Sequence, residues 1–291
     1  KQVRHARKTG WQKCRQQQRT GRSMSLTPSD DAEALAGLRR EIDEIDAEMH
    51  VLLQRRADVI GRLVSVKKTK TGAAFRPERE AAMMQRLAAR HRGELPFLTI
   101  AHIWRVIIST FTQLQAPYRV HLGGSDPALR DIARYQFGFS TPLVSHPGRD
   151  SALSTLNNAA SDLALVLNGG DSDWWTPAVA RGSHVIAAIP EIAVRDADAF
   201  APALVFAAAS VAVDELPRAV LALACDDAGA LARVIETGSA TILCGPVETG
   251  TRALVAIERT DVAGFLETAQ ARGVAVTPAG GAAIPVAPAT A

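Results

Sequence analysis

The sequence predicts a multidomain protein of the α and α/β classes, in which a helical N-terminal domain precedes two α/β regions. Apolar residues recur at steps of three and four between about residues 31 and 70, the spacing of one face of a long helix. Short β-like runs alternate with helical stretches after residue 118, and a second alternation of this kind begins near residue 217. A chain of 291 residues is long enough for several such parts, each with its own core.

Charge is distributed unevenly along the chain. Residues 1–22 carry eight basic side chains and no acidic one, whereas the rest holds 25 basic and 30 acidic residues. Basic arms are typical of nucleic-acid or membrane binding. We expect neither partner, because "MSLTPSDDAEAL" from Met24 reads as a natural beginning, so residues 1–23 are predicted to be a non-native or disordered extension.

Cysteine content and hydropathy narrow the class of protein further. Three cysteines, Cys14, Cys225 and Cys244, are scattered without the spacing of a disulfide framework or metal site, which favours a reducing cytoplasm. No uninterrupted apolar run reaches the roughly 18 residues of a membrane span. The sequence therefore predicts a cytoplasmic protein without a structural metal.

The first domain, predicted over residues 24–116, contains three helices. The first spans about residues 31–70, a rod of roughly 60 Å that a small domain cannot cover alone, so a helical homodimer is expected. Gly72 ends this rod, Pro77 begins a second helix that Gly93 terminates, and the third runs from about Phe97 to Gln115.

Two α/β regions follow. Residues 117–200 hold the strand-like runs "YRVHLGG", "TPLVSH", "DLALVLN" and "HVIAAIP", separated by helical stretches. Residues 201–291 contain, from about residue 217, elements in the order β-α-β-β-α-β, which predicts a ferredoxin-like module with a loose tail.

Several polar residues of the helical domain occupy unusual positions. Arg56 interrupts the apolar seam between Leu52 and Val59, and Lys67, eleven residues later, faces the same way at about 16 Å. Arg39 lies about 25 Å up the rod and roughly 100° around it, so it would reach the equivalent site of a partner helix. These cations suit a small dianion that forms no bond to the protein.

The other helices add neutral and acidic groups. Ser109 and Gln113, four residues apart, face the same way, and Arg79 and Glu80 begin the second helix. No His/Cys cluster, nucleophile–base pair or glycine-rich phosphate loop is evident, so no cofactor or metal is expected. Each residue alone has a simpler explanation: a snorkelling arginine, a helix surface or a charged first turn.

Three segments together resemble the all-helical chorismate mutase family: "LRREIDEIDAEMHVLLQRRADVIGRLVSVK", "RPERE" and "IWRVIISTFTQLQ". The resemblance covers about residues 35–115 and implies an intertwined helical dimer that converts chorismate to prephenate by an intramolecular Claisen rearrangement, a step of aromatic amino acid biosynthesis. The alternative is a catalytically inactive helical dimerisation and regulatory protein.

The resemblance also implies a role for each candidate residue. Arg39 would bind a substrate carboxylate in the neighbouring subunit's site and Arg56 one in its own, while Lys67 and Gln113 would contact the ether oxygen of the breaking bond. Arg79 would shape the pocket, Glu80 would accept from the ring hydroxyl, and Ser109 would assist a carboxylate. Arg76 stands where relatives often carry an acidic residue, but that contact is made by the main chain.

The second half resembles, in part, the first lobe of prephenate dehydratase. "VHLGGSDPALRDIARYQFG" matches it in the order of strand, turn and helix, but "LVLNGG" replaces a Pro-Ile-Glu-Asn segment, and Thr251 and Arg252 are the remnant of a Thr-Arg-Phe motif. We expect a shortened, non-catalytic or regulatory region, with a bifunctional chorismate mutase/prephenate dehydratase as the alternative. Asp126, Asp171, Asp173 and His184 are either catalytic or explained by capping and loop solvation.

Overall fold

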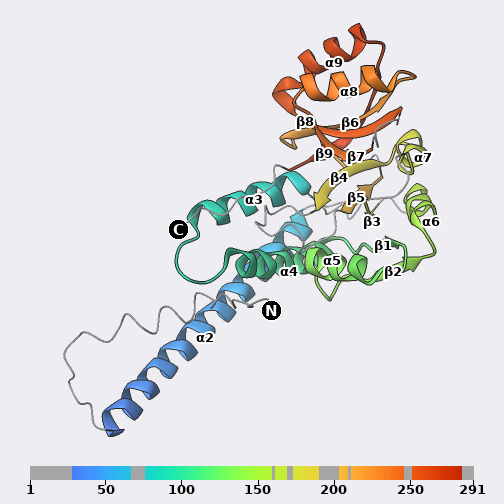
Figure 1. The fold of residues 1–291 in the computed structure, drawn as a ribbon. Helices are drawn as coiled ribbons and strands as arrows, with labels where there is room; N and C mark the ends of the chain where they lie inside the picture. Colours follow the sequence, from blue (N-terminus) through green and yellow to red (C-terminus); the bar gives the residue numbers. More distant parts are fainter. Residues whose placement is uncertain are drawn as a thin grey trace, which may run out of the picture. The chain divides into compact units, whose positions relative to one another are not determined.

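The computed structural model describes residues 28–66, 76–158, 161–168, 173–189, 203–208, 211–245 and 251–283, with side chains from residue 31 onward (Figure 1). The chain divides into two compact units, Lys1–Val59 and Ile60–Ala291, whose residues contact mainly other residues of the same unit. The predicted extension over residues 1–23, and with it Cys14, lies outside the described residues.

Helix α2, Pro28–Val66, is one continuous helix of 39 residues. Its sequence keeps the three-and-four apolar spacing on either side of Arg56. It contains no proline after its first residue, so nothing interrupts its main-chain hydrogen bonds. The helix predicted over residues 31–70 is confirmed up to Val66, and its predicted end at Gly72 falls in residues 67–75, which are not described.

The apolar seam of α2 is open to solvent in the single chain. Its seven members between Leu35 and Val59 each remain 50–59% exposed: Leu35, Leu38, Ile42, Ile45, Met49, Leu52 and Val59. Scattered exposed apolar residues are ordinary on protein surfaces, but a continuous row on one helix face is typical of an interaction surface.

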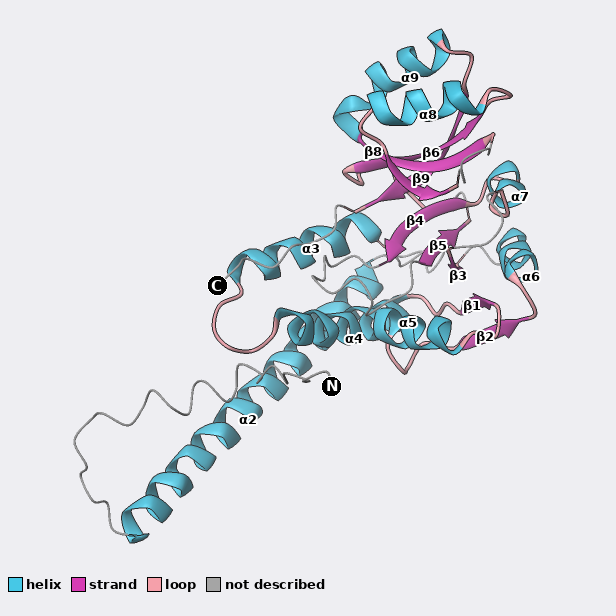
Figure 2. Ribbon diagram, viewed as in Figure 1, coloured by secondary structure: helices cyan, strands magenta, loops and turns pink. Residues whose placement is uncertain are grey.

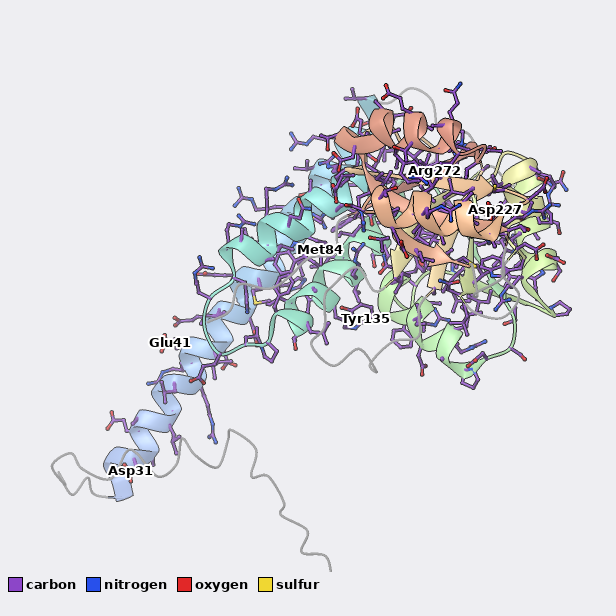
Figure 3. The ribbon with its side chains drawn as sticks, turned by 45° about the horizontal axis from the view of Figure 1, so that its top comes forward. Asp31, Glu41, Met84, Tyr135, Asp227 and Arg272 are labelled. Carbon is purple, nitrogen blue, oxygen red and sulfur yellow. The ribbon has the colours of Figure 1, made fainter. Side chains whose placement is uncertain are left out.

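Two shorter helices, α3 (Pro77–Arg90) and α4 (Phe97–Gln115), follow where they were predicted. Pro77 occupies the first turn of α3, where its missing N–H costs nothing, and Gly93 adopts a left-handed φ of 92° just after the helix. Met84 of α3, labelled in Figure 3, is 1% exposed and packs with Phe97 and Ala101 of α4.

Helix α4 is long and apolar enough, by length and composition alone, to cross a membrane. It nevertheless contains a charged residue, Arg105, which is buried inside the protein in an ion pair with Glu80. Because the core helix of a soluble protein passes the same test of length and composition, this finding indicates an internal helix as readily as a membrane span.

The following segment forms an α/β lobe. Its elements are β1 (Val120–Gly123), α5 (Pro127–Phe137), β2 (Leu143–His146), α6 (Arg149–Ser154), the 3-10 helix Thr155–Asn157, β3 (Leu163–Leu167), α7 (Thr176–Ala180), β4 (His184–Ile189) and β5 (Ala203–Ala207). Strands β2, β1 and β3 are parallel, while β5 pairs antiparallel with both β3 and β4. Short apolar runs buried on both faces are typical of strands covered by helices on either side.

The last segment has the predicted β-α-β-β-α-β order. Its elements are β6 (Arg218–Ala224), α8 (Ala228–Thr237), β7 (Thr241–Cys244), β8 (Arg252–Glu258), the 3-10 helix Arg259–Asp261, α9 (Val262–Ala271) and β9 (Ala275–Ala282). The strand order is β9-β6-β8-β7 with antiparallel neighbours, and α8 and α9 cover one face of these strands (Figure 2).

Strand β9 joins the two α/β segments into one nine-stranded sheet, in the order β2-β1-β3-β5-β4-β9-β6-β8-β7. The junction is the pairing of Gly280 with Val185 of β4. Gly280 has φ +133°, and a Cβ atom there would lie 2.0 Å from the main-chain oxygen of Val185. Only glycine satisfies both this backbone conformation and this close approach.

The predicted boundary between residues 200 and 201 stays a prediction. In the structure β5, which lies beyond that boundary, pairs with β3 and β4 and therefore belongs to the sheet of the lobe. One buried cluster, which includes Phe206, Val220 and Leu254, also runs continuously from the lobe into the last segment.

Candidate active site

Helix α2 carries two of the predicted cations. Arg39 is exposed, and Arg56 lies on the seam between Leu52 and Val59, as the sequence indicated. Seventeen residues separate the two arginines, which corresponds to about 25 Å along a helix, so they cannot share one small ligand on the same chain. Lys67, the third predicted cation, lies outside the described residues.

Glu80 lies in the first turn of α3 and is 8% exposed. Its Oε2 accepts a hydrogen bond from Nη1 of Arg105 at 3.1 Å, and Arg105 is itself 3% exposed. Burial raises the pKa of Glu80 to about 7, and the neighbouring Arg105 guanidinium opposes part of that rise. Glu80 is therefore a desolvated carboxyl, whereas Arg79 beside it is exposed.

Ser109 and Gln113 lie on α4, four residues apart as predicted. Ser109 is 4% exposed, and its hydroxyl donates to the carbonyl oxygen of Val106 at 3.1 Å. A Cβ atom at Gly138, just after α5, would come within 3.0 Å of the Ser109 hydroxyl, so α4 and the end of α5 are in close contact here.

The Gln113 side chain is hydrogen bonded at both ends of its amide. Its Nε2 donates to the carbonyl oxygen of Tyr118 at 2.6 Å, and its Oε1 accepts from the main-chain N–H of Tyr118 at 3.2 Å. Gln113 thus fixes the path of the chain between α4 and β1 while keeping the donor group that the predicted role requires.

Arg105 is a buried charged residue that was not among the predicted site residues. It is the one charged residue in the sequence of α4, "FLTIAHIWRVIISTFTQLQ". Arg105 interrupts an apolar helix face as Arg56 does, so its position in the sequence could have identified it in the same way.

The predicted residues fall into two sets that the structure describes separately. Arg39 and Arg56 belong to the unit Lys1–Val59, and the other described candidates belong to the unit Ile60–Ala291: Arg79, Glu80, Ser109 and Gln113. Across the described part of the chain no cluster of three or more His, Cys, Asp or Glu side chains could hold a metal ion. The donors present are guanidinium, amide and hydroxyl groups, with one buried carboxyl, a set suited to binding and electrostatic stabilisation of an anion.

Residues 38–116 match the family model of chorismate mutase type II. The matched segment contains every candidate residue named above from Arg39 to Gln113. The predicted resemblance over about residues 35–115 is therefore confirmed, with nearly the same limits.

The curated relatives of the chain carry a second activity in their names. The chain is 30% identical over 131 residues to a bifunctional chorismate mutase/prephenate dehydratase of Neisseria gonorrhoeae, and the match covers 45% of this chain and 36% of the relative. A protein of the same name from Aquifex aeolicus is 33% identical over 113 residues, covering 37% of this chain and 31% of the relative. The chain thus spans about a third of the length of the curated relatives it matches.

One solved structure aligns with part of the chain at a lower sequence identity than these relatives. Prephenate dehydratase from Streptococcus mutans aligns with 58% of this chain and 98% of its own length, with 16% identity and a TM-score of 0.42.

Two of the four candidate residues of the second half, Asp126 and Asp173, have structural partners. Asp126 caps α5 by accepting from the N–H of Ala128 at 2.9 Å, and Asp173 lies 3.4 Å from Arg252, which begins β8. His184 lies on β4, and Asp171 is not among the described residues. Capping and ion pairing therefore account for Asp126 and Asp173 without a catalytic role.

Proposed function

We propose that the chain is a chorismate mutase that converts chorismate to prephenate without a metal or cofactor. The observation that carries the proposal is the match of residues 38–116 to the chorismate mutase type II family, because all the candidate cations and amide donors fall within it. The names of the curated relatives support the same activity.

The proposed mechanism uses binding and charge alone. Arg56 and the Arg39 of a second copy would hold the two substrate carboxylates, while Lys67 would stabilise the negative charge that develops on the ether oxygen as the C–O bond breaks. Gln113 would donate to the same oxygen with the second N–H of its amide, because only one of the two is needed for the carbonyl of Tyr118. Such a reaction selects the compact conformer of the substrate and transfers no proton to the protein.

The buried carboxyl has a defined place in this proposal. Glu80 would accept a hydrogen bond from the ring hydroxyl of the substrate, with Arg105 holding the carboxyl in position at 3.1 Å. Ser109 would assist a carboxylate, and Arg79 would shape the entrance from the exposed side of α3. Arg105 is a positioning residue, since it acts through Glu80.

We further propose that two copies pair through α2. The exposed seam from Leu35 to Val59 has the three-and-four spacing of a helix that packs on another helix, and the identical face of a second copy is complementary to it. Pairing would also deliver Arg39 to the neighbouring site, which a single chain cannot do. Cys225 and Cys244 are not joined in a disulfide, which fits the expected cytoplasmic location.

A bifunctional chorismate mutase/prephenate dehydratase is the second candidate, favoured by the names of the relatives. A pocket of ≈ 690 Å³ lies at the carboxyl ends of β1, β2 and β3, lined among others by Arg149 and Trp174. The Arg149 guanidinium stands 4.9 Å from the Trp174 ring centroid. We favour a non-catalytic or regulatory second half, because Asp126 and Asp173 are committed to capping and ion pairing.

One assay separates these proposals. The purified chain is incubated with chorismate, and prephenate and phenylpyruvate are quantified against an enzyme-free control. Prephenate alone is the expected product. Phenylpyruvate above the acid-catalysed background would establish the bifunctional alternative, and no product would favour an inactive dimerisation module.

The site assignment is tested with paired variants. Arg56→Ala is expected to lower kcat/KM at least about a hundredfold, since a hydrogen-bonded charge on a carboxylate is worth several kcal/mol when desolvated. Arg55→Ala, the adjacent arginine of the same helix, removes the same charge off the seam and is the matched control. Equal activity in the two variants would reject the role of Arg56.

A further inference from the structure

A second pocket lies between α4 and α5, and its lining includes none of the residues assigned to the mutase reaction. It has a volume of ≈ 470 Å³ and is lined by His102 of α4 and by Arg130, Asp131, Arg134, Tyr135 and Phe139 of α5 and the turn after it. We call it the α4–α5 pocket. None of these residues has a role in the proposed mutase mechanism.

A fixed turn presents an aromatic ring at one wall of this pocket. Phe139 is 79% exposed, the largest exposure among the large apolar residues that the structure describes. Gly138 before it has a left-handed φ of 70°, and Nη1 of Arg134 donates to the carbonyl oxygens of Gly138, Phe139 and Thr141 at 3.0–3.2 Å. The Arg134 guanidinium also stands 5.3 Å from the Phe139 ring centroid. The ring is therefore held in solvent by a rigid turn.

Two stacked rings form another wall. His102 and Tyr135, the latter labelled in Figure 3, have ring centroids 5.1 Å apart and planes inclined by 15°. Nδ1 of His102 is buried and has no hydrogen-bond partner among the described residues. A buried polar atom without a partner carries a desolvation cost that a polar ligand at this wall would offset.

The charges at the rim favour an anion. Arg134 is committed to three carbonyl groups, whereas Arg130 is exposed and forms no ion pair within the part of the chain that the structure describes. Arg130 and Arg134 are four residues apart on α5 and carry two positive charges, against one negative charge on Asp131. The pocket thus offers flat apolar surfaces beside one available guanidinium.

We propose that the α4–α5 pocket binds a small monocarboxylate that carries an aromatic ring. The ring packs against Phe139 and the Tyr135–His102 stack, and the carboxylate pairs with Arg130. This site is additional to the proposed mutase site, and its ligand is a separate molecule from the dianion that reacts there.

The test uses three small probes with the full-length protein. Binding of 3-phenylpropanoate is measured by ligand-observed NMR at neutral pH, beside 3-phenylpropanol, which keeps the ring, and propanoate, which keeps the charge. The ring-bearing carboxylate is expected to bind at least about tenfold more tightly than either partial analogue, because a charge-assisted hydrogen bond and the ring burial each contribute.

Substitutions in the pocket test where the probe binds, and they are expected to change its affinity in opposite directions. Arg130→Gln and Phe139→Ala are each expected to weaken binding of 3-phenylpropanoate by about tenfold. Asp131→Asn is expected to strengthen binding by about threefold, because it removes a like charge near the carboxylate. Arg56→Ala, which alters the proposed mutase site, is expected to leave binding unchanged.

The possible failures are distinguishable. Binding that survives Arg130→Gln and Phe139→Ala but is lost in Arg56→Ala would assign the probe to the mutase site and overturn the proposal. A change of oligomeric state in Phe139→Ala, measured by light scattering with no probe bound at the pocket, would show a protein contact and would also overturn it. Mutase activity in Arg130→Gln is expected at the wild-type level, so failure of this proposal leaves the proposed function untouched.

Discussion

Replacement of Glu80 by glutamine should change how the stability of the protein depends on pH. Burial raises the pKa of Glu80 from 4.5 to about 7, so the folded state holds a proton that the unfolded state releases between these values. Stability from this group is fully present below pH 4.5 and is lost as the pH rises through about 7. A difference of about 2.5 in pKa corresponds to about 3 kcal/mol at most.

Glu80→Gln keeps the shape of the protonated carboxyl and an oxygen that accepts from Arg105, but it cannot ionise. The difference in the free energy of unfolding, variant minus wild type, should therefore rise from about zero near pH 4.5 to about 3 kcal/mol near pH 8. The variant is then the more stable protein at high pH.

The measurement is urea unfolding of both proteins across this pH range, followed by circular dichroism. Groups other than Glu80 titrate in both proteins and cancel in the difference. Glu94→Gln, the same substitution at an exposed position between α3 and α4, should follow wild type at every pH. Parallel pH profiles for Glu80→Gln and wild type would show that Glu80 is not desolvated and would refute the reasoning.

Two further substitutions test the junction and the seam. Gly280→Ala should destabilise the protein by about 3 kcal/mol or more in a thermal melting experiment, because it combines a left-handed φ with a Cβ placed 2.0 Å from a main-chain oxygen. The control is Gly264→Ala on α9. It should be neutral or stabilising in the same experiment, because no atom lies within 4 Å of the added Cβ. Ile42→Asp should weaken dimerisation about a hundredfold or more in sedimentation analysis, because two buried isoleucines are lost per dimer, whereas Ala47→Asp on the opposite face should not. A fully dimeric Ile42→Asp protein would exclude the seam as the interface.

Local pattern was sufficient to predict most of the elements. Helices α3 and α4 begin and end close to the predicted residues, and α2 begins close to its predicted start. Their signals, which are apolar spacing, Pro77 and Gly93, act within one or two turns. The four predicted strands of the lobe and the β-α-β-β-α-β order were likewise encoded in short apolar runs.

Tertiary partners were harder to predict. The pairing of Glu80 with Arg105 joins residues 25 apart on two helices, and no local rule relates them. Strand β5 was not among the predicted strands, and its pairing with β3 and β4 is what defines it. Helical spacing predicted the position of Gln113 on α4. It did not predict that both the nitrogen and the oxygen of the Gln113 amide are hydrogen bonded to the main chain of Tyr118.

The contact between Gly280 and Val185 has a consequence for how the second half of this chain can be divided. Strand β9 pairs with both β4 and β6. Cutting the polypeptide anywhere between β4 and β6 therefore separates β9 from β4, one of its two neighbours. Each fragment would then expose a fresh row of main-chain donors and acceptors, the kind of edge that invites aggregation. The lobe and the last segment should therefore be expressed together, so that β9 keeps both of its neighbours.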